Sequence, residues 1–383
     1  MFLLCSALLV CAAASFTAWK APTLLTWKIA ILAGEFGHFL VVIPLGLAIA
    51  AWMQPPDNVH AWLWMQRGTL VACAFAAAFF LKPSFQAWQL ARELPMRLER
   101  AFGLGRENAR RAFSPMAWLG DSVERVKPEP RIFAHAGEVD ALTLDFYRAA
   151  GRRTSAPCVI IVHGGGWDGG VRTQLPALNS RLAQRGYAVA AVSYRLAPKH
   201  VWPAQRDDVR AAIAYLKAHA RELGVDAGRL VILGRSAGGQ VAQAVAYDEP
   251  DLGVRGLISL YGPADLHFAW KYTSERDILD SFSLMKNLTG GTPETAREIF
   301  DSASPYLRVG PQAVPTLLMH GRIDSLVWHR QSERLAQKLG EAGVPCVFLD
   351  LPWATHAFDF NLHGPSGQLS TFAIEWFVDA VTR

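Results

Sequence analysis

The sequence predicts an α/β fold, with a mostly parallel twisted sheet and helices on both of its faces, preceded by an α-helical transmembrane region. Two observations lead to this prediction. From about Val126 onward, short β-rich runs alternate with helical runs, the pattern of a parallel sheet whose strands are joined by helices. Before that point the chain is apolar, and the only charged residues in the segment 1–81 are Lys20, Lys28, Glu35, Asp57 and Arg67.

Three apolar runs make up most of this first segment, at about Met1–Ala18, Phe36–Met53 and Gly68–Leu81, with Trp62–Met65 extending the third backward. A membrane-crossing helix needs about 17–25 predominantly apolar residues, so the first two runs are long enough. The third run is shorter and its extension carries Arg67, which leaves a span, an interfacial hairpin and a buried helix as alternatives. Residues 1–83 are therefore expected to form two or three transmembrane helices.

A cleaved signal peptide is the alternative for the first run, because Ala12–Ser15 resembles a small-residue cleavage site. A signal peptide begins with positive charge, however, and no Lys or Arg precedes Lys20. With three spans, the basic residues that follow Leu81 would place the segment after residue 82 in the cytoplasm by the positive-inside rule, and with two spans on the opposite side. We therefore expect a multi-pass protein of a bacterial inner membrane whose segment after residue 82 is cytoplasmic.

The basic residues after Leu81 also account for the net charge of +5. They are Lys82, Arg92, Arg97, Arg100, Arg106, Arg110 and Arg111. Positive charge beside an apolar segment indicates attraction to anionic lipid more than to nucleic acid. The expected partner of this part of the chain is therefore a lipid bilayer and not nucleic acid, and the sequence leaves the oligomeric state open.

Residues 84–125 are expected to form a basic amphipathic helical linker. Apolar residues recur near the helical period from Trp88 to Leu104 and are interleaved with arginines. Pro95 and the Gly103–Gly105 stretch are expected to break or kink this helix. Two placements fit the pattern equally, a helix lying on the membrane surface and a helix packed on the catalytic domain.

Residues 126–383 are expected to form the catalytic domain. Its predicted strands are Leu142–Tyr147, Cys158–His163, Ala188–Ser193, Leu230–Leu233, Gly256–Leu260, Thr316–His320 and Cys346–Leu351. Its predicted helices are Ala204–Glu222, Ala237–Tyr247, His329–Ala342 and Ser370–Val381. The polar stretch 263–305 interrupts the alternation and is interpreted as an inserted cap or lid.

Ser236 is the candidate nucleophile. The predicted strand Leu230–Leu233 leads into Gly234-Arg-Ser-Ala-Gly238, and a helical pattern follows. This is the strand-to-helix context that a G-x-S-x-G elbow requires, in which glycines permit a turn tight enough to expose the serine hydroxyl. A plain glycine-rich turn is the alternative.

A second glycine-rich loop, His163-Gly-Gly-Gly-Trp167, follows the predicted strand that contains Val159–Val162. An oxyanion needs backbone N–H donors without side chains in the way, and glycines supply them. We assign the oxyanion hole to the N–H groups of Gly164, Gly165 and Ala237, with His163 as a structural anchor and Trp167 as a substrate-binding candidate. A phosphate-binding loop fits poorly, because no Gly-Lys-Ser/Thr run follows.

Asp324 and His356 are the candidate acid and base that would activate Ser236. In α/β-hydrolase chains the acid and then the histidine follow the serine, each just past a strand. Asp324 comes shortly after Thr316–His320, and His356 shortly after Cys346–Leu351. The neighbouring alternatives are Asp265, Asp301, His320, Asp350, Asp359 and His363.

Together these motifs resemble the hormone-sensitive-lipase-like and feruloyl-esterase-like (BD-FAE-type) carboxylesterases of the α/β-hydrolase superfamily. The similarity includes Tyr194-Arg-Leu-Ala-Pro198, Asp207-Asp208 and His356-Ala-Phe358, and it extends over about residues 126–383. The resemblance implies hydrolysis of a carboxylic ester through an acyl-enzyme, with no cofactor and no metal. Two departures, Arg235 where many lipase-like members have Asp and Lys199 where they have Glu, bear on the subfamily and the substrate.

The leading hypothesis is thus a membrane-anchored serine carboxylesterase with the triad Ser236, His356 and Asp324, acting on a small-molecule or lipid-like ester. An amidase, or a deacetylase acting on an acylated sugar or lipid, would use the same three residues. A hypothesis of another class is a membrane scaffold that keeps a degenerate hydrolase fold without catalysis.

Overall fold

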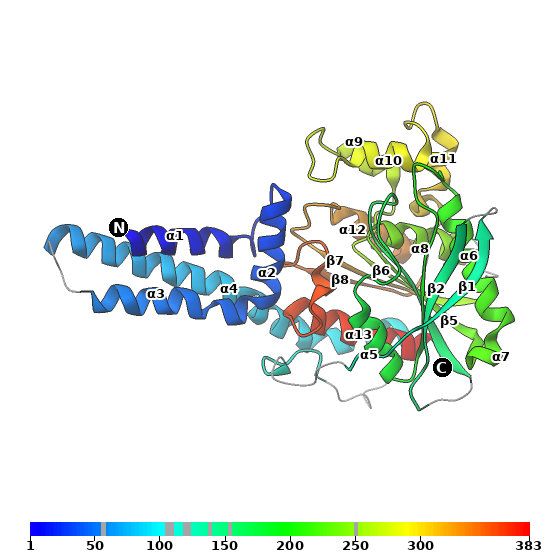
Figure 1. Ribbon diagram of the computed structural model, residues 1–383, viewed down its shortest axis with the longest axis horizontal. Helices are drawn as coiled ribbons and strands as arrows, with labels where there is room; N and C mark the ends of the chain where they lie inside the picture. Colours follow the sequence, from blue (N-terminus) through cyan, green and yellow to red (C-terminus); the bar gives the residue numbers. More distant parts are fainter. Residues whose placement is uncertain (55–58, 104–110, 118–123, 137–139, 152–154, 249–251) are drawn as a thin grey trace.

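The computed structural model describes residues 1–54, 59–103, 111–117, 124–136, 140–151, 155–248 and 252–383. Eight strands form one sheet in the order β1-β2-β4-β3-β5-β6-β7-β8 (Figure 1). The strands are β1 (Glu129–Ala136), β2 (Asp140–Tyr147), β3 (Ala156–Val162), β4 (Ala188–Val192), β5 (Val225–Arg235), β6 (Val254–Leu260), β7 (Thr316–Gly321) and β8 (Cys346–Leu351). Only the β1–β2 and β2–β4 pairs are antiparallel. The seven predicted strands are present, and β1 is an additional edge strand.

Helices cover both faces of this sheet, as expected for parallel strands that are apolar throughout. Along β3, Cys158, Ile160 and Val162 face one hydrophobic cluster, while Val159 and Ile161 face the other. The first cluster includes side chains of α6 (Ala204–Ala218), α8 (Ala237–Asp248) and α12 (Arg330–Glu341). The second includes side chains of α5 (Pro176–Gln184), α13 (Pro365–Val381) and the last part of α4 (Val59–Phe102). The α/β-hydrolase fold expected from the sequence is therefore present.

Helix α4 runs without interruption from the N-terminal region onto the sheet, with Pro83 and Pro95 inside it. The predicted break at Pro95 is wrong, and the helix ends at Phe102, immediately before Gly103. A proline inside a helix costs about 3 kcal/mol, but Leu94 and Leu98 on either side of Pro95 are fully buried against the sheet, and burying each contributes about 1.5–3 kcal/mol. Of the two placements open for this segment, the structure has the helix packed on the catalytic domain.

The N-terminal helices form a bundle that projects away from the sheet (Figure 1). Helices α1 (Phe2–Ser15) and α3 (Val42–Met53) lie along the first half of α4, and α2 (Leu24–Leu40) lies across the junction between the bundle and the sheet domain. Between α2 and α3 the chain bends by 58°, so the second apolar run is not one straight helix.

Within the described residues, one helix has the length and composition to cross a membrane, namely Ala61–Phe102 of α4, and a second does so only if the bent pair α2 and α3 is counted as one span. Helix α1, with 14 residues, and α3, with 12, rise only about 21 and 18 Å, less than the ~30 Å of a bilayer core. The prediction of two or three separate spans is therefore not supported, because the first run forms a helix of only 14 residues and the second run is divided between α2 and α3.

Helix α2 is held against the catalytic domain by a buried glutamic acid side chain. Glu35 is 2% exposed, and its Oε2 accepts a hydrogen bond of 3.2 Å from the backbone N–H of Ser366 in the first turn of α13, where N–H groups lack partners within the helix. Burial raises the pKa of Glu35 to about 8, so this carboxyl group is mostly neutral at pH 7. Asn361 Nδ2 donates a further hydrogen bond of 3.3 Å to the backbone oxygen of Glu35.

The segment predicted as a cap, 263–305, folds into short helices above the carboxyl ends of the strands (Figure 1). They are α9 (Leu266–Tyr272), α10 (Ser281–Thr289) and α11 (Arg297–Ser302). Asp265 caps the first of them by accepting a hydrogen bond of 2.9 Å from the backbone N–H of Phe268. These helices cover the edge of the sheet at which Ser236 lies.

Candidate active site

Ser236 lies in a sharp turn between β5 and α8. Its φ of +53° is in the left-handed region, which costs a residue with a side chain about 1–3 kcal/mol. The flanking glycines permit this turn, because a Cβ on Gly234 would lie 2.1 Å from the carbonyl oxygen of Gly238, and one on Gly238 would lie 2.2 Å from that of His163. The local structure is thus the strand–turn–helix elbow that the motif predicts.

His356 and Asp324 lie in a continuous hydrogen-bonded chain with Ser236. His356 Nε2 is 2.9 Å from Ser236 Oγ, and His356 Nδ1 is 2.7 Å from Asp324 Oδ2. Because an ionised carboxylate can only accept, Nδ1 carries the proton and Nε2 is left to accept the serine proton. The three predicted residues are separated widely in sequence, and the structure brings them together from the ends of β5, β7 and β8.

The carboxylate of Asp324 is fully surrounded by hydrogen-bond donors. Its Oδ1 accepts bonds of 2.7 and 2.9 Å from the backbone N–H groups of Leu326 and Val327, and its Oδ2 lies 3.1 Å from His320 Nε2. Burial alone would raise the pKa of Asp324, but the charges and hydrogen bonds of His356 and His320 outweigh burial and hold this pKa well below its usual range. Asp324 therefore remains ionised at neutral pH.

His320 is a site residue that the sequence left among the alternatives. It is completely buried, and its Nδ1 lies 2.8 Å from Ser332 Oγ while its Nε2 also lies 3.0 Å from the backbone oxygen of Val327. Since that backbone oxygen can only accept, Nε2 donates, and the same N–H faces Asp324. His320 thus orients Asp324 and has no hydrogen bond with Ser236 among the described residues. The sequence feature that could have indicated this role is the position of His320 near the end of β7, four residues before Asp324.

The glycine-rich loop is anchored by His163, as expected. His163 Nδ1 lies 2.9 Å from the backbone oxygen of Gly164, and its ring stacks on Tyr194 with centroids 4.3 Å apart. Burial lowers the pKa of His163, so its ring stays neutral. The hydroxyl of Tyr194 in turn donates to the backbone oxygen of His163 at 3.1 Å. The Tyr194-Arg195 motif therefore supports the loop, with Arg195 paired to Asp208.

One predicted oxyanion donor is not supported by the geometry. The N–H of Gly164 donates to Gln174 Oε1 at 3.1 Å, so it is already engaged. The N–H groups of Gly165, Gly166 and Ala237 have no acceptor among the hydrogen bonds of the described residues. Gly165 and Gly166 have φ values of +128° and +64°, conformations that only glycine adopts readily. Gly164 also borders the second cavity at Ser236, but among the described hydrogen bonds only the N–H groups of the later two glycines of this loop lack an acceptor.

Arg235, the departure noted beside the nucleophile, forms a buried ion pair. It is 1% exposed, and its Nε donates to Asp359 Oδ2 at 2.5 Å, while the hydroxyl of Tyr261 donates to Asp359 Oδ1 at 2.5 Å. Burial alone would lower the pKa of Arg235, but Asp359 raises it. The ring of Tyr261 lies against His356 with centroids 4.3 Å apart. The Arg235–Asp359 ion pair, together with Tyr261, therefore supports the loop that carries His356.

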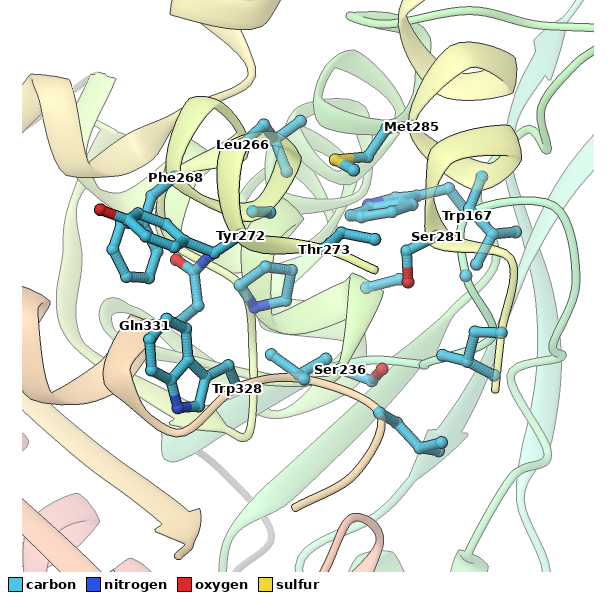
Figure 2. A pocket seen from close by; sticks show the side chains of 18 residues that line it. Trp167, Ser236, Leu266, Phe268, Tyr272, Thr273, Ser281, Met285, Trp328 and Gln331 are labelled. Carbon is cyan, nitrogen blue, oxygen red and sulfur yellow. The ribbon is translucent and has the colours of Figure 1, made fainter. Parts of the chain in front are cut away.

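Two cavities meet at Ser236. The first has a volume of about 90 Å³ and lies under the cap helices, where Trp167, Leu266, Phe268, Met285 and Trp328 line it (Figure 2). The second has a volume of about 430 Å³ and is bordered by Gly165, Arg235, Tyr261, His356 and Trp27. Trp167, the predicted substrate-binding residue, is held by a hydrogen bond of 2.9 Å from its Nε1 to Gln240 Oε1.

The remaining acidic and histidine alternatives have other partners. Asp265 caps α9 and pairs with Arg334, Asp301 lies 2.7 Å from His267 Nε2, and Asp350 pairs with Arg322. His363 lies beyond the His356 loop, where its backbone N–H donates to Asn361 Oδ1 at 3.1 Å. None of these four side chains borders either cavity at Ser236.

Comparison with known proteins gives the same family. The BD-FAE family model matches residues 144–339, just over half of the 383-residue chain. The protein called probable carboxylic ester hydrolase LipM of Mycobacterium tuberculosis is 27% identical over 97% of this chain and 91% of that relative. Esterase LipC of the same organism is 33% identical over 64% of each chain.

Among solved structures, a bacterial heroin esterase superposes with a TM-score of 0.60 over 70% of this chain and 88% of that one, at 23% identity. The similarity to this solved structure supports the α/β-hydrolase fold, and the family match and the curated relatives support ester hydrolysis. The chain therefore belongs to the BD-FAE family of α/β-hydrolases and is a carboxylic ester hydrolase.

Proposed function

We propose that this esterase works through an acyl-enzyme on Ser236. His356 Nε2 removes the proton from the serine hydroxyl as Oγ attacks the ester carbon, and Asp324 holds His356 in the required tautomer and stabilises its positive charge. His356 then gives the proton to the departing alcohol. Water repeats the sequence on the acyl-enzyme and releases the carboxylic acid. The observation that carries this proposal is the hydrogen-bonded chain from Ser236 Oγ through His356 to Asp324.

The oxyanion that forms on the ester carbonyl requires fixed donors. Gly165 and Ala237 keep this predicted role, and Gly166 takes the place of Gly164, because the Gly164 N–H is engaged by Gln174. Gly166 borders both cavities at Ser236, so its N–H lies where the two halves of an ester meet. Removing one such donor from an oxyanion hole typically costs about 10²–10³ in kcat.

Replacement of Ser236 with Ala tests the nucleophile. We expect hydrolysis of p-nitrophenyl acetate by Ser236→Ala to fall to the solution background, with an unchanged thermal unfolding curve. A fluorophosphonate probe should label the wild-type chain and not the variant, which also separates a working esterase from a scaffold with a degenerate site. Undiminished turnover by Ser236→Ala would refute the assignment.

We further propose that the first half of α4 anchors the enzyme in a membrane. Residues 61–81 rise about 31 Å, which matches the ~30 Å bilayer core. Large apolar side chains on this half face outward, with Trp64 74%, Val71 56% and Phe75 59% exposed. Exposed apolar surface of this extent favours lipid contact, because it would be costly in water.

Three of the four cations of residues 1–83 lie toward the end of the bundle nearest the catalytic domain, whereas Arg67 lies in the first half of α4. Lys82 Nζ donates to the backbone oxygen of Thr17 at 3.1 Å, so the end of α1 lies beside the middle of α4. Lys20 lies over the ring of Trp328, at the rim of the first cavity, and Lys28 is on α2. By the positive-inside rule, this distribution favours a cytoplasmic catalytic domain.

Two measurements test the anchor and its orientation. Val71→Asp puts a charge at the bilayer centre, at a cost of about 2.5–3.5 kcal/mol, and should shift the protein out of the membrane fraction. Met96→Asp is the matched control, because Met96 is also exposed, at 52%, but lies on the half of α4 that packs on the sheet domain. A reporter fused after Arg383 should be active only inside the cell; activity outside would reverse the orientation.

A further inference from the structure

Helix α2 of the N-terminal region forms part of the active site. Trp27 borders the second cavity together with Ser236 and His356, although it precedes them by more than 200 residues. Its indole Nε1 is buried and has no hydrogen-bond acceptor among the described residues. A buried donor without an acceptor is costly, at about 1–3 kcal/mol, unless a ligand or water satisfies it. Trp27 therefore contributes part of the wall of this cavity, while its Nε1 itself is buried.

The position of His356 decides which half of the ester enters each cavity. His356 must deliver its proton to the oxygen of the departing alcohol, so this alcohol has to lie beside His356 Nε2. His356 borders the second cavity and is not among the residues that border the first. We therefore name the second the alcohol cavity and the first the acyl cavity.

The volume that a water-sized molecule can enter is more than four times larger in the alcohol cavity than in the acyl cavity. The alcohol cavity, at about 430 Å³, lies within the range of about 300–1,000 Å³ in which protein pockets hold a complete small-molecule ligand. The acyl cavity, at about 90 Å³, lies far below that range. Its walls are well supported, because Trp167 and Met285 are both buried. The sizes indicate a short acyl group on a large alcohol.

The charges around the alcohol cavity disfavour an anionic alcohol. The positive charge of Arg235 is neutralised by Asp359, and the carboxylate of Asp168 also borders the cavity. An anionic alcohol would therefore meet no free positive charge and one negative charge among the described residues of this wall. Three leucines, Leu279, Leu284 and Leu326, add apolar lining, which suits an uncharged alcohol.

The wall formed by α2 also connects this cavity to apolar surface. Leu25 and Leu32 of α2 are 69% and 50% exposed, and the helix leads directly into the bundle. An alcohol with long apolar chains can keep those chains against α2 and the bilayer while its oxygen reaches His356. Resting on the proposed function, we infer that the enzyme removes short acyl groups from large, uncharged, membrane-resident alcohols, and that Trp27 is a specificity-determining residue for the alcohol.

The test uses the full chain in phosphatidylcholine vesicles that contain 1,2-dioleoyl-3-acetylglycerol, with p-nitrophenyl acetate in solution as the reference ester. The wild-type enzyme should release acetate from the lipid in at least about tenfold excess over oleate. Trp27→Ala should lower this acetate release about tenfold, through a higher KM, while its turnover of p-nitrophenyl acetate stays within about threefold of wild type. Trp27→Phe, which keeps most of the aromatic wall, should show a smaller loss than Trp27→Ala.

Trp19→Ala is the matched control, because Trp19 is a 67% exposed tryptophan of the same region that borders neither cavity. It should leave both activities unchanged. Preferential release of oleate, no loss on Trp27→Ala, or equal losses on both substrates would each overturn the inference. If wild-type turnover of p-nitrophenyl acetate did not depend on Ser236, the proposed catalytic mechanism would fail instead, so the two failures are distinguishable.

Discussion

The acyl cavity and the alcohol cavity meet at one serine but are built from different parts of the chain. The acyl cavity is made by the catalytic domain alone, from the cap helices, Trp167 and Trp328. The alcohol cavity takes Trp27 from a helix that precedes the catalytic domain. Substitutions in the first should therefore change acyl selectivity, and substitutions in the second should change the choice of alcohol. Residues shared by both should affect every substrate equally.

The largest effect is expected at Asp324, which holds His356 and therefore acts on every ester, whichever cavity its two halves occupy. Asp324→Asn keeps the shape of the side chain but no longer holds His356 with its proton on Nδ1. We expect kcat/KM to fall roughly 10³–10⁴-fold for every ester, whatever its acyl group or alcohol. Steady-state kinetics with p-nitrophenyl acetate, p-nitrophenyl butyrate and the acetylated lipid would measure this.

Asp301→Asn is the matched control for Asp324→Asn, because Asp301 lies beside His267 and borders neither cavity. It should leave kcat/KM within about twofold of wild type. A loss at Asp324 that varied with the acyl chain would contradict a shared role.

A smaller, selective effect is expected at Met285 in the acyl cavity. Met285→Ala lengthens this cavity, and each methylene that can be accommodated or rejected in an apolar pocket is worth about 10–200-fold in discrimination. The ratio of p-nitrophenyl octanoate to p-nitrophenyl acetate turnover should rise about tenfold. Leu307→Ala, at a 46% exposed position outside both cavities, is the control. An unchanged ratio would show that Met285 does not limit chain length.

A still smaller effect is expected when α2 is loosened without changing the cavity wall. Glu35→Ala removes the acceptor for the Ser366 N–H, so α2 loses one attachment to α13. Acetate release from the lipid should fall about threefold, with p-nitrophenyl acetate turnover nearly unchanged. Trp19→Ala, at an exposed position outside both cavities, should have less effect. Equal losses on both substrates would indicate a general loss of stability.

The smallest effect concerns acid stability. Because the histidines beside Asp324 outweigh its burial, its pKa in the folded chain is lowered. A lowered folded-state pKa contributes stability that is complete above the unfolded pKa of about 4 and is lost as the pH falls toward the folded value. Between about pH 5 and pH 3, the thermal midpoint should therefore decrease more for wild type than for Asp324→Asn. Parallel decreases would contradict this.

Much of the catalytic centre could be predicted from short motifs. Gly234 and Gly238 mark the elbow because no side chain fits there, and Asp324 and His356 follow consecutive strands because parallel strands end at one edge of the sheet. The sequence could not distinguish Gly164 from Gly165 and Gly166 as an oxyanion donor, because a glycine run supplies three similar N–H groups. The hydrogen bond from the Gly164 N–H to Gln174 distinguishes them, and it depends on how the loop folds back.

The N-terminal region was less predictable. Its apolar composition was evident, but run length did not give helix length, since the bend beside Val41 divides the second run. Pro95 suggested a break that the burial of Leu94 and Leu98 prevents. Local propensities of a few kcal/mol are outweighed by packing against residues far away in the sequence.

The sequence by itself determined the fold class and the chain order of the three residues proposed as the triad, because these depend on local patterns and on the direction of the strands. The tertiary structure alone decided that α4 continues onto the sheet, that His320 orients Asp324 and that Trp27 borders the cavity of Ser236. Each of these rests on contacts between segments distant along the chain. Such contacts leave no periodic pattern, because they are fixed only when the apolar faces of the helices pack together.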